Sequence, residues 1–260
     1  MSFAPPAPAA TADPAAWLTP RIQWGDDWVT GTVGTGYQAY ARIFHPLDDG
    51  PHPPRWADVA AQHGRTMHPS AQWEHISSTV APTDTMNRGR GFPGEPDIGN
   101  LHAQALASLC TLLRDYTTTP DDCWFAVWDG WGWQHPGAHA VMQSTRIGDP
   151  APPIEHAPDA KRLNLAAPKF SLPHRNYYLF NGPIDSAASI GDWITADWFD
   201  PQSPSIFWPT NHAWCVATEI DFDSTLVGGT SDLITAITSS THLEALPVAP
   251  DAPYQDLINI

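Results

Sequence analysis

Hydrophobic residues recur every three or four positions between residues 100 and 116, which predicts an amphipathic helix with Asn100 as its N-cap. The residues of this stripe are Leu101, Ala105, Leu109, Leu112, Leu113 and Tyr116. A second helix is expected after Ser231, capped by Thr230, Ser231 or Asp232, and a shorter helix over 55–63 should end at Gly64. Asp185 could cap a brief helical segment that stops at Gly191.

Several runs rich in aromatic and branched residues predict strands. One covers 37–44 and another covers 177–180. The run 123–128 is apolar without alternation, which is typical of a central strand that is buried on both faces.

The segment 214–223 alternates strictly, which predicts one long strand. One face is apolar throughout, from Trp214 to Phe222. The other face ends with three carboxylates, those of Glu219, Asp221 and Asp223.

The remaining stretches predict loops and an extension. Residues 82–99, with Arg88 and Arg90, and residues 148–173 are rich in Pro and in part Gly, and therefore predict long surface connections. Residues 1–16 are rich in Ala and Pro and are expected to form a disordered leader. The elements together favour a single globular α+β domain over 17–260, with a mixed β-sheet covered by a few helices.

Charge narrows the functional classes. The 260 residues include 12 Lys and Arg and 28 Asp and Glu, a net charge of −16, which disfavours a nucleic-acid-binding protein. With 42% hydrophobic residues and 13 Trp, the chain is too apolar to be disordered as a whole. Residues 176–260 contain eleven acids and no Lys or Arg. This acidic segment is either a solvated surface or a face for a basic partner or a cation.

Three cysteines, well separated along the chain, make no Cys-x-x-Cys pair. Cys123 and Cys215 lie in apolar runs, as free thiols in a hydrophobic core do, so we expect a reduced, cytoplasmic protein. No apolar stretch is long enough to span a membrane, and none forms a signal peptide.

The three carboxylates of the alternating segment are candidate metal ligands. On one strand face, Glu219, Asp221 and Asp223 would lie roughly 6–7 Å apart and repel one another, and Mg²⁺ or Ca²⁺ would relieve that repulsion. A helix N-terminus close in sequence would favour a phosphate. The alternative is an acidic solvent-exposed face with no cofactor.

Tryptophans beside turns are candidate binding residues. Trp128, Trp131 and Trp133 surround a glycine-containing turn, and Trp208 precedes the acidic segment together with His212. Such residues can line a site for a peptide, a sugar or a cationic group, although most tryptophans pack in the core. His68, His75, His174 and His212 are candidate acid–base groups, each equally consistent with a local hydrogen-bonding role.

Five blocks spread along the chain resemble a group of uncharacterised actinobacterial proteins. They are residues 40–46, 55–57 with 67–69, 123–130, 178–183 and 207–229. The resemblance implies a shared fold and a cytosolic origin, and it implies no activity.

Two functions remain open. The first is a non-catalytic binding or accessory protein, similar to an immunity factor, whose acidic and aromatic C-terminal part recognises a basic protein or peptide. The second is a metal-dependent phosphoester hydrolase that uses the carboxylates of Glu219, Asp221 and Asp223. The sequence contains no catalytic motif that decides between them, and it does not indicate an oligomeric state.

Overall fold

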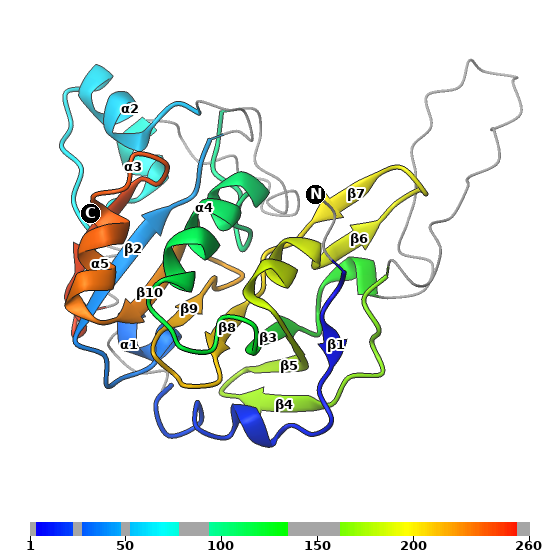
Figure 1. Cartoon of the computed structure of the whole chain (residues 1–260). Coiled ribbons are helices and arrows are strands. Elements are labelled where there is room, and N and C mark those ends of the chain that lie inside the picture. Colours follow the sequence, from blue (N-terminus) through cyan, green and yellow to red (C-terminus); the bar gives the residue numbers. More distant parts are fainter. Residues whose placement is uncertain (1–3, 23–27, 48–52, 78–93, 135–161, 254–260) are drawn as a thin grey trace, which may run out of the picture.

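The computed structural model describes residues 4–22, 28–47, 53–77, 94–134 and 162–253. These residues form a single α+β domain built on a nine-stranded sheet (Figure 1), in which every strand pairing is antiparallel. The predicted class, a single α+β domain with one large sheet covered by helices, is therefore confirmed.

The order of strands across the sheet is β1-β5-β3-β8-β9-β10-β2-β11. Strand β4 pairs with the same outer edge of β5 as β1 does, but with an earlier part of that strand. The strands are β1 (Ala7–Pro8), β2 (Ala39–Phe44), β3 (Cys123–Trp128), β4 (Lys169–Leu172), β5 (Arg175–Gly182), β8 (Ile206–Pro209), β9 (Cys215–Ala217), β10 (Ser224–Gly229) and β11 (Ala245–Val248). A separate hairpin consists of β6 (Gly191–Trp193) and β7 (Phe199–Pro201).

Helices cover one face of the sheet. They are α4 (Ala103–Arg114), α5 (Ser231–Thr238) and the 3₁₀ helix η5 (Ile184–Ser189). Leu109 of α4 and Leu233 of α5 share a buried cluster with Phe125 of β3. Because side chains alternate along a strand, the neighbouring Ala126 points to the other face and joins a second cluster.

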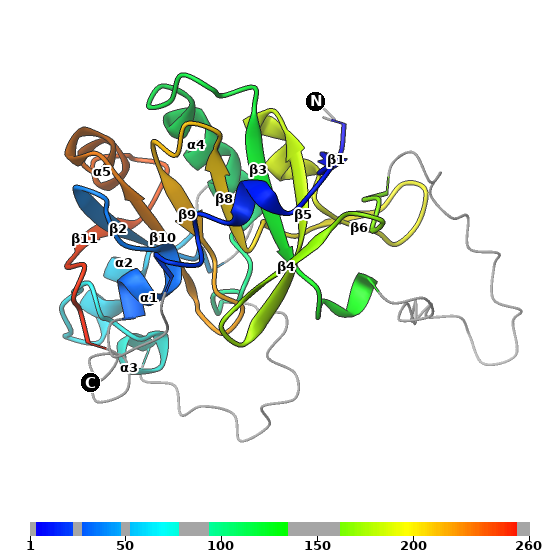
Figure 2. The ribbon, with the colours of Figure 1, turned by 90° about the horizontal axis from the view of Figure 1, so that it is seen from below.

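The opposite face is covered by the N-terminal part of the chain (Figure 2). It contributes η1 (Asp13–Ala15) and α1 (Trp28–Val33) to the second cluster. The helices α2 (Trp56–Gln62) and α3 (Trp73–Ser77) form a third cluster with Phe44 at the end of β2. One more 3₁₀ turn, η3 (Gly132–Gln134), follows β3.

The long periodic elements match their predictions. Helix α4 lies within 100–116, β3 covers 123–128, and the Thr230 side chain caps α5 by accepting a hydrogen bond from the Leu233 amide. Asn100 does not cap α4: its side chain instead accepts from the Ser203 amide and donates to the carbonyl of Pro201. Asp185 is likewise no cap, because its carboxylate pairs with Arg114.

The prediction of one long strand over 214–223 is wrong. Strand β9 ends at Ala217, the Phe222 amide donates to the Glu219 carbonyl in a turn, and β10 begins at Ser224 and returns beside β9. The alternation therefore continued across a hairpin turn. Gly228 and Gly229 are the last residues of β10.

The expectation of a disordered leader over 1–16 does not hold for residues 4–16. Ala7 and Pro8 pair with Asn181 and Phe180 of β5, and Ala15 is buried. Most of the predicted connections 82–99 and 148–173, with Arg88 and Arg90, lies outside the described residues.

Candidate functional site

The three acidic residues proposed as metal ligands form ion pairs with arginines. Arg175, at the start of β5, lies 2.9 Å from carboxylate oxygens of both Glu219 and Asp221. Arg42, on β2, lies 2.9 Å from Asp223. Burial raises the pKa of Glu219, and the nearby Arg175 opposes that shift.

Because these residues lie in the turn between β9 and β10, their carboxylates do not share one strand face. Among the described residues, no group of three or more His, Cys, Asp or Glu side chains is placed to hold a metal ion. The repulsion on which the metal hypothesis depended is relieved by guanidinium groups. The described geometry thus gives the hydrolase hypothesis no support.

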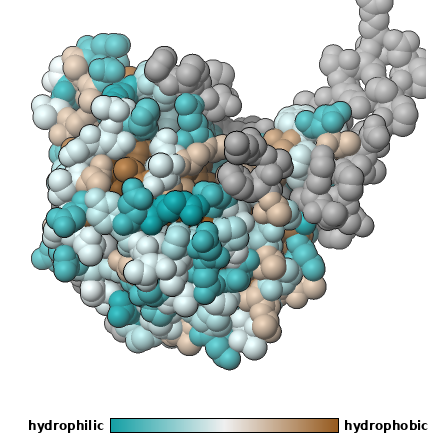
Figure 3. All heavy atoms as spheres, viewed as in Figure 1, coloured by the Kyte–Doolittle hydropathy of each residue, from teal (hydrophilic) through white to brown (hydrophobic). Residues whose placement is uncertain are grey.

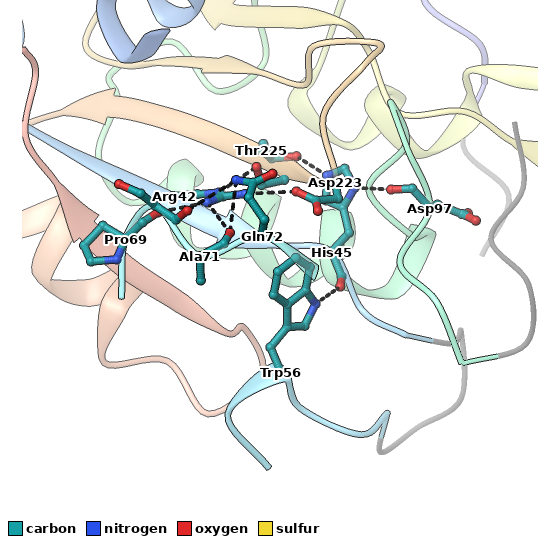
Figure 4. A network of polar contacts seen from close by, with 11 residues as sticks. Arg42, His45, Trp56, Pro69, Ala71, Gln72, Asp97, Asp223 and Thr225 are labelled. Carbon is teal, nitrogen blue, oxygen red and sulfur yellow. Dashed lines mark hydrogen bonds and ion pairs between the residues drawn. The ribbon is translucent and has the colours of Figure 1, made fainter. Parts of the chain in front are cut away.

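Arg42, which is 1% exposed, donates four side-chain hydrogen bonds (Figure 4). Its Nε donates to the Ser224 hydroxyl at 2.8 Å, and Nη1 donates to the carbonyls of Pro69 and Ala71 at 2.9 and 2.8 Å. Its Nη2 donates to Asp223. A buried charge is tolerated only when it is paired and hydrogen-bonded, and Arg42 meets both conditions.

Beside this arginine lies His45, a fully buried residue that follows β2. Its Nδ1 lies 2.6 Å from the Asp97 carbonyl, and its Nε2 lies 3.0 Å from the Thr225 hydroxyl. Because a carbonyl only accepts, Nδ1 carries the proton and Nε2 accepts from Thr225. Thr218 lies 2.8 Å from Thr225 and extends the chain of hydrogen bonds.

Burial keeps this imidazole neutral, because it lowers the pKa of His45 from 6.5 to about 4. A hydroxyl that donates to a neutral imidazole is also the arrangement of a nucleophile and its general base. Here, however, Thr225 and His45 are both 0% exposed, so no substrate can reach the hydroxyl in this conformation. Arg42, His45, Asp223, Ser224 and Thr225 thus form one buried hydrogen-bond network, and its role in this conformation is to fix structure.

What the network fixes is the junction of four segments. It joins β2 and β10 to the α2–α3 region through the carbonyls of Pro69 and Ala71, and Trp56 donates from Nε1 to the His45 carbonyl at 2.9 Å. On the other side it holds the segment at Asp97, whose carboxylate pairs with His102 at 2.9 Å. Figure 4 shows these residues converging from separate elements.

The predicted aromatic binding residues fall into two groups. Trp128 and Trp131 pack edge to face with ring centroids 5.5 Å apart, and Arg175 lies over the Trp128 ring. Trp131 and Trp133 also pack against the helix-covered core.

Trp208 and His212 belong to the second group. His212 stacks on Trp17 at 4.2 Å, and Trp17 contacts the edge of Trp208, which is 0% exposed. Burial lowers the pKa of His212, and Arg21 acts in the same direction. Trp208 is therefore a core residue and does not reach a ligand.

An exposed tryptophan was missed by the sequence reasoning. Trp198, in the turn between β6 and β7, is 49% exposed, and no other large hydrophobic residue among those described is exposed. A signal was present in the sequence, because Asp197 precedes Trp198 in a stretch without Lys or Arg.

The three cysteines are buried free thiols, as expected for Cys123 and Cys215. Desolvation raises the pKa of Cys123 to about 12 and raises the pKa of Cys110 and Cys215 as well. A thiol held in its protonated form is a poor nucleophile.

The described helices include none with the length and apolar character needed to cross a membrane. Comparison of the chain with protein-family models, curated proteins and solved structures gives no match.

Proposed function

We propose that the protein is a non-catalytic binding protein that recognises a basic protein or peptide. The observation that carries this proposal is the distribution of charge within residues 176–260, which contain acids but no Lys or Arg. Asp197, Asp232 and Asp251 are exposed, and the described structure shows no ion pair for any of them.

Among the described residues, three arginines pair with acids of this segment, namely Asp185, Glu219, Asp221 and Asp223, and none pairs with Asp197, Asp232 or Asp251. Arg42, Arg114 and Arg175 each bind carboxylates that lie close to the sheet and its helices. The exposed acids therefore contribute to a negative field, which accelerates encounter with a positively charged partner and raises the affinity at low salt.

Calorimetric titration of the full chain tests the proposal. The probes are a 12-residue peptide of alternating Arg and Ser and a matched peptide of alternating Glu and Ser. We expect binding of the Arg peptide only, with an affinity that falls as NaCl is raised from about 50 to 300 mM because salt screens charges on exposed surfaces. No binding of the Arg peptide at low salt would overturn the proposal.

The same titration with Mg²⁺ and Ca²⁺ addresses the hydrolase alternative. The proposed binding function predicts no heat beyond dilution. A stoichiometric site that is lost in Asp221→Asn would favour the metal-dependent enzyme instead.

A further inference from the structure

The β6–β7 hairpin differs from the rest of the described surface. It projects at the end of the molecule opposite α2 and α5 (Figures 1 and 2), and its turn presents Trp198 to solvent. Figure 3 shows hydrophilic and hydrophobic residues side by side on this projection, at the upper right of the view. Tryptophan is enriched among the residues that contribute most of the binding energy at protein interfaces.

The turn is ordered before any partner binds. The Thr195 hydroxyl accepts hydrogen bonds from the amides of Asp197 and Trp198 at 3.4 and 3.1 Å, and the Ile194 amide donates to the Trp198 carbonyl at 2.9 Å. Below the turn, the rings of Trp193 and Phe199 pack 5.1 Å apart across the two strands. Binding through Trp198 would therefore cost little conformational entropy.

The chemistry of the hairpin selects a cation. Residues 191–201 contain no Lys or Arg, and Asp197 is their exposed acid, whereas Asp192 is buried. The exposed Asp197 carboxylate adjoins Trp198 in sequence, so one guanidinium group can stack on the indole while it pairs with the carboxylate. Within the described part of the chain, Arg162 contacts the hairpin by donating to the Trp193 carbonyl, and no ion pair involves the Asp197 carboxylate.

We propose that the β6–β7 hairpin is the docking element for an arginine-rich segment of a partner protein, with Trp198 as the anchor and Asp197 as its charge partner. This inference rests on the proposed function and names the surface that performs it. A flexible chain segment suits a convex tip, because such a segment can wrap an indole that projects into solvent.

Calorimetry with the Arg-Ser peptide tests this assignment in the full-length protein. Trp198→Ala leaves the net charge unchanged, so a purely electrostatic surface predicts no effect, whereas an anchor residue predicts a loss of affinity of about tenfold or more. Asp197→Asn should weaken binding by about threefold and reduce its salt dependence. Asp251→Asn, which removes the same charge from another exposed site, is the matched control and should weaken binding less than Asp197→Asn does, because it removes only a share of the overall negative field.

The possible outcomes separate the two proposals. If the wild type binds and Trp198→Ala binds equally well, the hairpin is not the docking element, although the binding function stands. If the wild type does not bind, both proposals fail. Sedimentation of the wild type as a dimer that Trp198→Ala converts to a monomer would assign the hairpin to self-association instead and overturn the inference. Because Trp198 is exposed, urea unfolding of the variant should match that of the wild type.

Discussion

Replacing Asp223 with asparagine removes the negative charge that faces Arg42 while keeping the shape of the side chain and one carbonyl oxygen as an acceptor. The guanidinium remains fixed by the Ser224 hydroxyl and by the carbonyls of Pro69 and Ala71. In Asp223→Asn, the buried Arg42 guanidinium would therefore have only neutral hydrogen-bond partners.

The expected cost follows from the geometry. Two unit charges about 4 Å apart attract by about 4 kcal/mol at an effective dielectric constant near 20, and removing one member of a buried pair typically costs about 3–5 kcal/mol. We expect Asp223→Asn to lower the free energy of unfolding by about 3 kcal/mol. Asp221→Asn is the matched control, because Asp221 is 72% exposed and its pair with Arg175 is worth at most about 1 kcal/mol.

Urea unfolding followed by tryptophan fluorescence measures both values. With a slope of about 3 kcal/mol per M, the Asp223 variant should unfold at a urea concentration about 1 M lower than the wild type. Equal losses in the two variants, or a loss below about 1 kcal/mol for Asp223→Asn, would refute the reasoning that burial makes this pair strong.

Three further predictions follow from the described contacts. The unfolded chain protonates histidine near pH 6.5 but buried His45 does so only near pH 4, so the free energy of unfolding should fall by up to about 3 kcal/mol as the pH is lowered through this window. The free energy of unfolding, measured from urea curves between pH 4 and 7, should depend less on pH in His45→Asn than in the wild type, whereas His242→Asn should keep the wild-type pH dependence. Equal pH dependence in the two variants would contradict the assignment. Gly99→Ala should cost about 2 kcal/mol more than Gly64→Ala in the same assay: both glycines have φ near +70°, but a Cβ at Gly99 would lie 2.6 Å from the Ile220 carbonyl oxygen, whereas nothing lies within 4 Å at Gly64. A thiol reagent at pH 8 should modify no cysteine in the native protein and all three in urea, and a thiol that reacts quickly in the native state would show that it is not buried.

Elements with strong periodicity and clear ends were predictable from the sequence. The stripe from Leu101 to Leu113 and the Thr230 cap each specify local structure without reference to the rest of the chain. The unbroken apolar run of β3 also indicated its position between two strands, which the pairings with β5 and β8 confirm.

Features that depend on distant contacts were not predictable. No Gly or Pro marks the turn at Glu219, so the alternation concealed it. The ion pairs of Asp223 and Glu219 involve arginines 181 and 44 residues away, which no local pattern reveals. The Ala/Pro-rich N-terminal segment acquires a strand because β4 covers the outer edge of β5 only as far as Tyr178 and leaves Phe180 and Asn181 to pair with Pro8 and Ala7.

The position of β2 in the sheet determines when the fold can be completed. Its two neighbours are β10 and β11, so Ala41 pairs with Val227 on one side and with Pro247 on the other. During synthesis, β2 therefore remains unpaired until most of the chain has been made and β10 and β11 are available. We expect folding to be late and slow, since contacts between such distant segments carry a large loop-closure cost. A chain released before Ser224 would have no strand to pair with β2, and its unpaired edge and apolar face would favour aggregation.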